Sequence, residues 1–345
     1  MDLFSTNTLV GVVQDLRTPP SHFLDTEFRG LLEDPSEEIH FDVDESKPRI
    51  TPFVSPLVAG KVVNDRGFTT KTFKPAYAKD KRRWDPNRPL KRVIGEKLGG
   101  GLSPDQRIRL LVGQTLEDQL AMLTRREEVM AAEALRLGQV TVSGEGFPTQ
   151  VVSFGRHANL RATLLTNDRW SVTHADSNPL EDIEAWAVEM QLRSGAVPRR
   201  VTFAPDAWKA FRGRLVQRDE WKYLVDYRRA STDSSVDLAP GNGEKARYVG
   251  SIGSFDFWVY DDIYLDDAGA EQHIMPSGEV VMTADELEGT RCYAAIQDEE
   301  ANYTATRYFP KSWFEKDPAV RWMLLQSAPL VVPFRPNASF GAQVL

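Results

Sequence analysis

The sequence is poor in residues that build covalent or metal-bound frameworks. It has one cysteine, Cys292, which excludes an intrachain disulfide and is typical of a reducing compartment. Cys292 falls in an expected strand, where a cysteine is usually a small core hydrophobe. The five histidines are scattered, and no two of them share a helical turn. We therefore expect no metal site and no cofactor.

Long apolar runs are also missing. No run of about 18 apolar residues occurs, so we expect no transmembrane helix and no membrane partner. Asp2 stands where a signal peptide would be basic, and no apolar run follows it, so we expect no signal peptide. The net charge of −8 argues against a protein that coats the phosphate backbone of a nucleic acid.

Familiar catalytic signatures are absent. The chain contains no GxxxxGK[ST], HExxH, paired CxxC or GxSxG motif. Glycines 99–101 could cradle an anion before a helix or act as a hinge. Asp261, Asp262, Asp266 and Asp267 could bind calcium, but they lack EF-hand spacing and also suit a solvated loop. Glu299 and Glu300 could act as an acid–base pair, but no neighbouring motif in the sequence indicates that role. We expect no catalytic residue and no enzyme activity.

The strongest positive signal is one long amphipathic helix over residues 103–138. Ser103 suits an N-cap, Pro104 the first helical position, Gln106 a capping box and Gly138 a C-terminal stop. The alternative is a coiled-coil or bundle helix, although only one such helix is evident. Charged residues are expected to fill its outer face: Arg107, Arg109, Glu117, Asp118, Arg125, Arg126, Glu127 and Glu128.

Two segments before this helix cannot bury their apolar residues alone. Residues 1–44, with a strand at 37–44, predict an arm on its own domain or on a neighbouring chain, or else an ordinary first segment. Residues 57–64 and 67–74 predict a hairpin that turns at 65–67. Basic and aromatic residues alternate around it over residues 53–92, which is compatible with single-stranded nucleic acid. Docking on an acidic copy of the same chain is the favoured interpretation.

Helices and strands alternate after the long helix. We expect a hairpin at 140–154, a loop at 160–171, helices at 178–194 and 204–215, and an exposed loop at 228–243. Strands are expected at 201–203, 248–250, 255–260, 278–283, 290–296, 303–308, 322–326 and 330–334.

Ordered motifs along the chain resemble one known family. The blocks are FVSPLVAGKV at 53–62 with RG at 66–67, FKPAY at 73–77 with Lys79, SGEGF at 143–147, DIEAW at 182–186, and a tail of RYFPKSW at 307–313, DPA at 317–319 and QSAPL at 326–330. They resemble the major capsid proteins of lambda-like tailed phages, the phage capsid protein E family. Phe309 is inserted relative to the family pattern, and residues 1–44 and 160–178 match weakly.

The resemblance implies an α+β fold of the Hong Kong 97 type. It implies an N-terminal arm at 1–45 and an extended loop (E-loop) at 46–100, with glycines 99–101 as a hinge. A peripheral domain would hold 101–178 and 289–315, with 103–138 as its spine helix. The axial domain and C-terminal strands would hold 179–288 and 316–345. Covalent cross-linking through an E-loop lysine such as Lys71 is possible in this fold, but the sequence does not support it.

The function implied is a major capsid protein of a virion, assembled in the host cytoplasm. Its partners would be itself, in hexamers and pentamers, with a decoration protein, a scaffolding protein and a portal. The shell would enclose double-stranded DNA without sequence-specific binding, behind an acidic inner surface. Alternatives are the shell of a cargo-carrying nanocompartment and a soluble α/β enzyme. Apolar strips are expected to lie on neighbouring copies: Leu9, Val10 and Phe23 from the arm, and Phe53, Phe68 and Phe73 from the E-loop.

Overall fold

The computed structural model describes most of the chain. The described residues are 3–44, 50–51, 53–56, 59, 68–85, 87–92, 96, 101–144, 146–171, 173–174, 177–223, 245–266, 268–317 and 319–345. The expected turn at 65–67, the loop at 228–243, Gly99, Gly100 and Asp267 lie outside them, as does the expected strand at 57–64 apart from residue 59.

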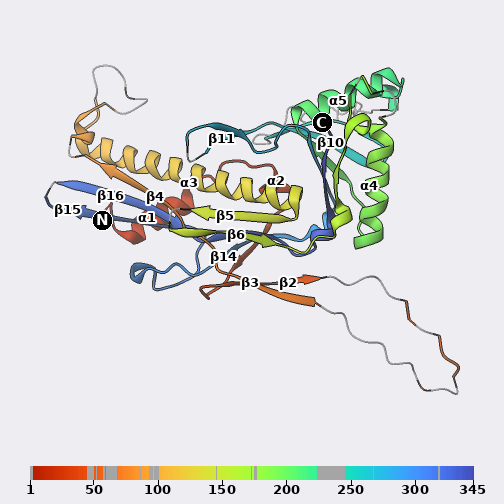
Figure 1. Cartoon of the computed structure of the whole chain (residues 1–345). Coiled ribbons are helices and arrows are strands. Elements are labelled where there is room, and N and C mark those ends of the chain that lie inside the picture. Colours follow the sequence, from red (N-terminus) through yellow and green to blue (C-terminus); the bar gives the residue numbers. More distant parts are fainter. Residues whose placement is uncertain are drawn as a thin grey trace, which may run out of the picture.

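The long helix is confirmed as α3 (Pro104–Leu137). The Ser103 side chain accepts the amide N–H of Gln106, and Gln106 Oε1 accepts the amide N–H of Ser103 at 2.9 Å, so the capping box is complete. Gly138 ends the helix with a φ of 68°. α3 packs on strands β17, β5, β18 and β13, which excludes the bundle alternative. Figure 1 shows it running from the end near β15 and β16 towards α4, above the β5–β6 hairpin.

A six-stranded sheet covers the C-terminal end of α3. Its order is β7 (Arg161–Thr163), β18 (Ser339–Gln343), β13 (Glu279–Thr283), β8 (Arg200–Phe203), β10 (Phe255–Tyr260) and β9 (Ala246–Ile252). Helix α4 (Pro179–Ser194) packs on β18, and α5 (Pro205–Gln217) packs on β8 and β10. Both begin at a proline, as expected from the missing N–H of that residue. Phe211 of α5 is buried and its ring packs near the buried rings of Phe203 and Trp170.

A smaller sheet lies under the middle of α3. It contains β1 (Gly30–Glu33), β14 (Gly289–Tyr293) and β17 (Pro329–Pro333). β1 pairs with β14 in parallel, although about 260 residues separate them along the chain. The short helix α2 (Phe23–Thr26) contacts α3 directly. The hairpin of β5 (Gln139–Gly144) and β6 (Phe147–Ser153) folds back along α3.

A third sheet packs at the other end of α3. Its order is β15 (Phe309–Glu315), β16 (Val320–Ser327) and β4 (Ala78–Trp84). Helix α1 (Thr6–Asp15) lies between this sheet and α3 and builds a second core. Two further pairs complete the described strands: β2 (Ile39–Asp44) with β3 (Phe68–Phe73), and β11 (Ile263–Leu265) with β12 (Glu271–His273). β2 and β3 lie on the lower side of the molecule in Figure 1.

Most expected elements are confirmed, and the exceptions have local causes. The strand expected at 303–308 is wrong, because Asn302 and Tyr303 have φ values of 50° and 55° in a tight turn and β15 begins at Phe309. The strand expected at 67–74 is present as β3 and pairs with β2, whereas its expected partner at 57–64 lies outside the described residues apart from residue 59. The loop expected at 160–171 contains β7, and the sequence predicted neither α1 nor β18.

Candidate functional site

The described residues do not form a cluster of metal ligands. No three His, Cys, Asp or Glu side chains gather there as metal ligands, and no described helix is both long and apolar enough to cross a bilayer. The acidic residues considered as calcium ligands serve local structure. Asp261 lies 3.3 Å from His273, Asp262 pairs with Lys245 at 3.1 Å, and Asp266 caps its own turn through the amides of residues 268 and 270.

Two other residues considered in the sequence, Glu300 and Cys292, also have structural surroundings. Glu300 accepts a hydrogen bond from the hydroxyl of Thr6 in α1 at 3.2 Å, so it helps to hold the first helix. Cys292 in β14 is fully buried, which confirms its expected role as a core hydrophobe. Burial raises the pKa of its thiol to about 12, so the nucleophilic thiolate is suppressed.

Glu128 of α3 anchors the segment that precedes β1. Its carboxylate accepts the backbone N–H groups of His22 at 3.0 Å, Phe23 at 2.8 Å and Leu24 at 3.0 Å. These are the donors that the first turn of α2 leaves without intrahelical partners. The side chain is buried, and burial raises the pKa of the carboxyl group. We call this contact the arm anchor.

His22 belongs to the same buried contact. Its ring nitrogen Nε2 lies 3.2 Å from Thr202 Oγ1, and its ring lies 5.0 Å from that of Tyr260. Burial, assisted by the positive charge of Arg200, lowers the pKa of His22 to about 3. The imidazole is therefore neutral over the ordinary pH range and adds no charge next to Glu128.

The adjacent Glu127 ties α3 to β14. Both of its carboxylate oxygens lie 3.1 Å from the hydroxyl of Tyr293, which donates to them. Arg307 Nη2 lies 3.8 Å away. Burial raises the pKa of Glu127 to about 7. The expectation that Glu127 and Glu128 line the charged outer face of the helix is wrong, because both are buried with hydrogen-bond partners.

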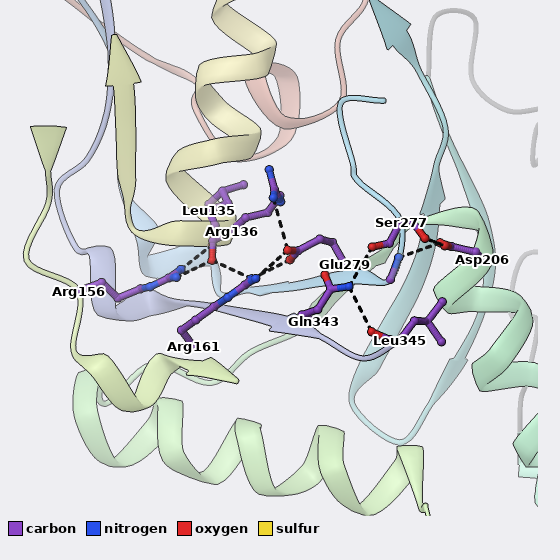
Figure 2. Close-up of polar contacts among 10 residues, drawn as sticks. Leu135, Arg136, Arg156, Arg161, Asp206, Ser277, Glu279, Gln343 and Leu345 are labelled. Carbon is purple, nitrogen blue, oxygen red and sulfur yellow. Dashed lines mark hydrogen bonds and ion pairs between the residues drawn. The ribbon is translucent and has the colours of Figure 1, made fainter. Parts of the chain in front are cut away.

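An arginine cluster holds the C-terminal end of α3 against the six-stranded sheet (Figure 2). Arg161 donates two hydrogen bonds of 2.7 Å to Glu279 of β13, and Arg136 lies 3.4 Å from the same carboxylate. Arg156 donates to the carbonyl oxygens of Leu135 and Arg136, which the helix end leaves free. Burial lowers the pKa of Arg156 to about 9. The cluster therefore joins the helix to the sheet by charge-assisted hydrogen bonds.

The residues of the apolar strips that were expected to lie on neighbouring copies differ in how far they are buried within their own chain. Leu9 and Phe23 are buried within their own chain, so the expectation is wrong for these two residues. Leu9 fills the core between α1 and α3, and Phe23 packs edge-on against Tyr260. Phe73 packs against the main core, whereas Phe53 is fully exposed. The side chain of Phe68 lies outside the described residues.

Three of the basic residues near β3 and β4 pair within their own chain, whereas Lys79, Lys81 and Arg83 of β4 are exposed. Lys71 Nζ donates to the carbonyl oxygen of Ser153 at 2.9 Å, and Lys74 pairs with Glu37. Arg82 contacts both Asp80 and Asp118, at 3.0 and 3.3 Å. These contacts do not favour the single-stranded nucleic acid interpretation, which requires cations available to phosphate groups.

Comparison with known protein families identifies the family of this chain. The model of the family described as phage major capsid protein E matches residues 5–344. The chain belongs to that family. This capsid family consists of virion structural proteins, not enzymes. The resemblance deduced from the ordered motif blocks is therefore confirmed.

Individual relatives of this capsid chain match it from end to end. It is 27% identical over 349 residues to the major capsid protein of Escherichia phage lambda, with all of both chains covered. It is 28% identical, with the same coverage, to the major capsid protein of Enterobacteria phage P21.

Solved structures show that the fold is shared. A protein assigned as the capsid protein of a prophage of Escherichia coli CFT073 aligns with a TM-score of 0.76 and 24% identity over 99% of both chains. The capsid of Ralstonia phage GP4 aligns with a TM-score of 0.56 and 12% identity, covering 95% of this chain and 91% of that one. The mixed α+β architecture with one long helix is thus that of phage capsid proteins.

The arm anchor was missed from sequence, although a signal for it exists. Glu128 lies three residues before Ala131, four before Ala132 and seven before Leu135, so it is in line with apolar positions of α3. A carboxylate at a core-facing position of a helix requires buried donors. The sequence therefore allows the prediction that this carboxylate needs buried donors, but it does not reveal that the donors are the amides of residues 22–24.

Proposed function

We propose that this protein is the major capsid protein of a tailed bacteriophage, which self-assembles as hexamers and pentamers into an icosahedral shell around double-stranded DNA. The observation that carries this proposal is the match to the capsid family over residues 5–344, combined with the phage capsid fold over the same length. The chain contributes shape and contacts, and no chemical step is required of it.

The proposed division of the subunit into parts is supported by the composition of the six-stranded sheet. Residues 1–45 form the arm, 46–100 the E-loop, 101–178 with 289–315 the peripheral domain, and 179–288 with 316–345 the axial domain and C-terminal strands. In support, α4, α5 and four strands of the six-stranded sheet come from 179–288, and β18 joins them from the last segment. β7 pairs with β18 and extends the same sheet.

Assembly would cover apolar side chains that the single chain leaves exposed. Phe53 and Ile50 in the E-loop and Leu31 and Leu32 in β1 are examples among the described residues. Such contacts are heterologous, because one patch meets a different patch on the next copy, and they close into rings when the rotation permits. A decoration protein, a scaffolding protein and a portal are further proposed partners, and the enclosed DNA would be held without sequence-specific contacts.

Particle formation tests the proposal. Purified protein should form closed shells that elute far above the 38.9 kDa chain mass and appear as icosahedral particles by electron microscopy. A chain that stays monomeric under every assembly condition and in lysates would contradict it. Particles that carry protein cargo, without tails or DNA in the producing host, would instead support the nanocompartment alternative.

A further inference from the structure

One face of the β15–β16–β4 sheet combines cations with tryptophans. We define the basic face as Lys79, Lys81 and Arg83 of β4, Trp322 of β16, and Lys311 and Trp313 of β15. The strand register places Arg83, Trp322 and Trp313 in one cross-strand row. The next row is Lys81, Leu324 and Lys311.

The opposite side of the same sheet is fully used within the chain. Trp84, Met323 and Leu325 point into the core that α1 and α3 share, and all three are buried. The basic face is therefore the only side of these strands on which long cationic side chains remain exposed among the described residues. Lys79, Lys81 and Arg83 are exposed there, as expected for alternate residues of a half-buried strand.

The tryptophan rings are already occupied by a lysine. Lys81 Nζ lies 4.2 Å from the ring centroid of Trp322 and 5.3 Å from that of Trp313. The indole N–H of Trp322 donates to Glu315 at 3.0 Å. A nucleic acid base stacks on an open aromatic face, but Lys81 lies over these two rings and occupies that position. The arrangement fits carboxylates combined with small apolar groups better than it fits bases.

A complementary segment exists elsewhere on the same chain. Residues 31–38, which we call the acidic turn, comprise the end of β1 and the turn that follows it, and they expose Leu31 and Leu32 with exposed fractions of 57% and 38%. Glu33 and Glu38 are exposed beside them, while Glu37 pairs with Lys74 of its own chain. β1 adjoins β14 near the middle of the molecule, whereas β15, β16 and β4 lie at one end (Figure 1).

We propose that the basic face binds the acidic turn 31–38 of a second copy of this chain. The inference rests on the proposed function and names one of its contacts. Carboxylates of the turn meet Lys81 and Arg83, and Leu31, which lies on the same side of β1 as Glu33, covers the edges of the tryptophan rings. Because face and turn are different patches, the contact leaves a free face and a free turn at its two ends, so it can propagate from copy to copy. Opposite charges also steer the encounter.

Charge reversal with compensation tests this contact. Lys81→Glu with Arg83→Glu, and separately Glu33→Lys with Glu38→Lys, should each slow particle formation by at least about tenfold, since like charges then face each other. The protein that carries all four substitutions restores opposite charges and should assemble within about twofold of wild type. Light scattering gives the rate, and electron microscopy identifies the particles.

A matched control reverses two exposed cations elsewhere. Lys209→Glu with Arg212→Glu on α5 makes the same change of charge and should not be rescued by the reversed turn. If wild type forms no particles, the proposed function fails. If wild type assembles and the four-substitution protein is no faster than either pair, only the basic-face contact is wrong. The proposed contact would also be wrong if a single-stranded oligonucleotide bound in a Lys81-dependent way while assembly stayed unchanged, since the basic face would then bind nucleic acid.

Discussion

The side chain of Glu128 performs a task that a short helix cannot perform for itself. α2 has four residues, and its N-terminal position, His22, provides no side-chain cap. A carboxylate from α3 satisfies three of its amides instead, which gives three charge-assisted hydrogen bonds inside the protein. Each such bond contributes about 1.5–3 kcal/mol, and the donors become costly if the carboxylate is removed.

Replacing Glu128 should therefore destabilise the chain strongly. Glu128→Ala leaves three buried amides without an acceptor, and we expect the free energy of unfolding to fall by about 3–5 kcal/mol. Glu117→Ala removes an exposed carboxylate from the same helix and should change the free energy of unfolding by less than about 0.5 kcal/mol. Urea unfolding of the two unassembled variants measures the difference. Equal stabilities would show that the arm anchor contributes little.

Glu127 should make the stability of the chain depend on pH. Its pKa is about 7 in the folded protein against 4.5 normally, so the folded state binds the extra proton between these values. Its contribution is therefore complete below about pH 4.5 and is lost as the pH rises towards 7, a loss of up to about 3 kcal/mol. Glu127→Gln should reduce the decline in unfolding free energy between about pH 5 and pH 8. Glu117→Gln is the control, and a decline identical in both variants would contradict the assignment.

At the scale of elements, the end of α3 is fixed by close approach as well as by charge. Gly341 of β18 passes directly beside the helix end, and a Cβ at this position would lie 2.1 Å from the carbonyl oxygen of Arg136. Backbone atoms cannot yield as a flexible side chain can. The glycine thus lets the central part of the six-stranded sheet contact the last turn of α3, next to the arginine cluster.

Gly341→Ala should separate these two elements. We expect the unfolding free energy to fall by about 2–3 kcal/mol, as for other overpacked sites, because the helix end or the strand must shift. Gly144→Ala is a matched control, since a Cβ at Gly144 meets no heavy atom of the described residues within 4 Å. Thermal unfolding compares the two proteins. An unchanged melting temperature for Gly341→Ala would show that the contact relaxes freely.

Elements with strong end signals were predictable, and elements decided by tertiary partners were not. Ser103, Pro104 and Gly138 determine both ends of α3 through local hydrogen bonds, so they are readable from sequence. β18 is different. Its residues Ser339 to Gln343 include a glycine and alternate weakly, and their strand conformation comes from pairing with β13 and β7. The turn at Asn302 and Tyr303 likewise depends on left-handed backbone that the apolar pattern around it does not reveal.

At the scale of the whole molecule, exposed apolar residues report on assembly. Phe53→Cys introduces a thiol at a fully exposed position, while the native Cys292 is buried and should not react. A maleimide should label the unassembled variant within minutes and the particle at least about tenfold more slowly, if a neighbour covers this position. Glu117→Cys on the exposed side of α3 provides the comparison. Equal labelling of Phe53→Cys in both states would mean that the E-loop residue stays open in the shell.

The family and overall architecture were accessible from sequence because ordered motifs spread over the chain identify them together. The buried contacts were less accessible. Glu128 and the amides of 22–24 are more than a hundred residues apart, and Arg161 and Glu279 are separated by a similar distance. Periodicity reports which side of an element is buried, but it does not report which distant group lies opposite. Those pairings follow from the complete fold.

The pairing of β1 with β14 has a consequence for the order of events during synthesis. Gly30 pairs with Thr290, and Glu33 pairs with Tyr293, so this edge of the sheet cannot close until nearly the whole polypeptide has left the ribosome. Glu128 is translated much earlier and can hold the preceding residues in the meantime. A nascent chain therefore cannot complete the strand that precedes the acidic turn. This edge of the sheet thus forms late in synthesis, long after the segment that carries Glu128 has been made, which sets a lower limit on when the subunit can enter a growing shell.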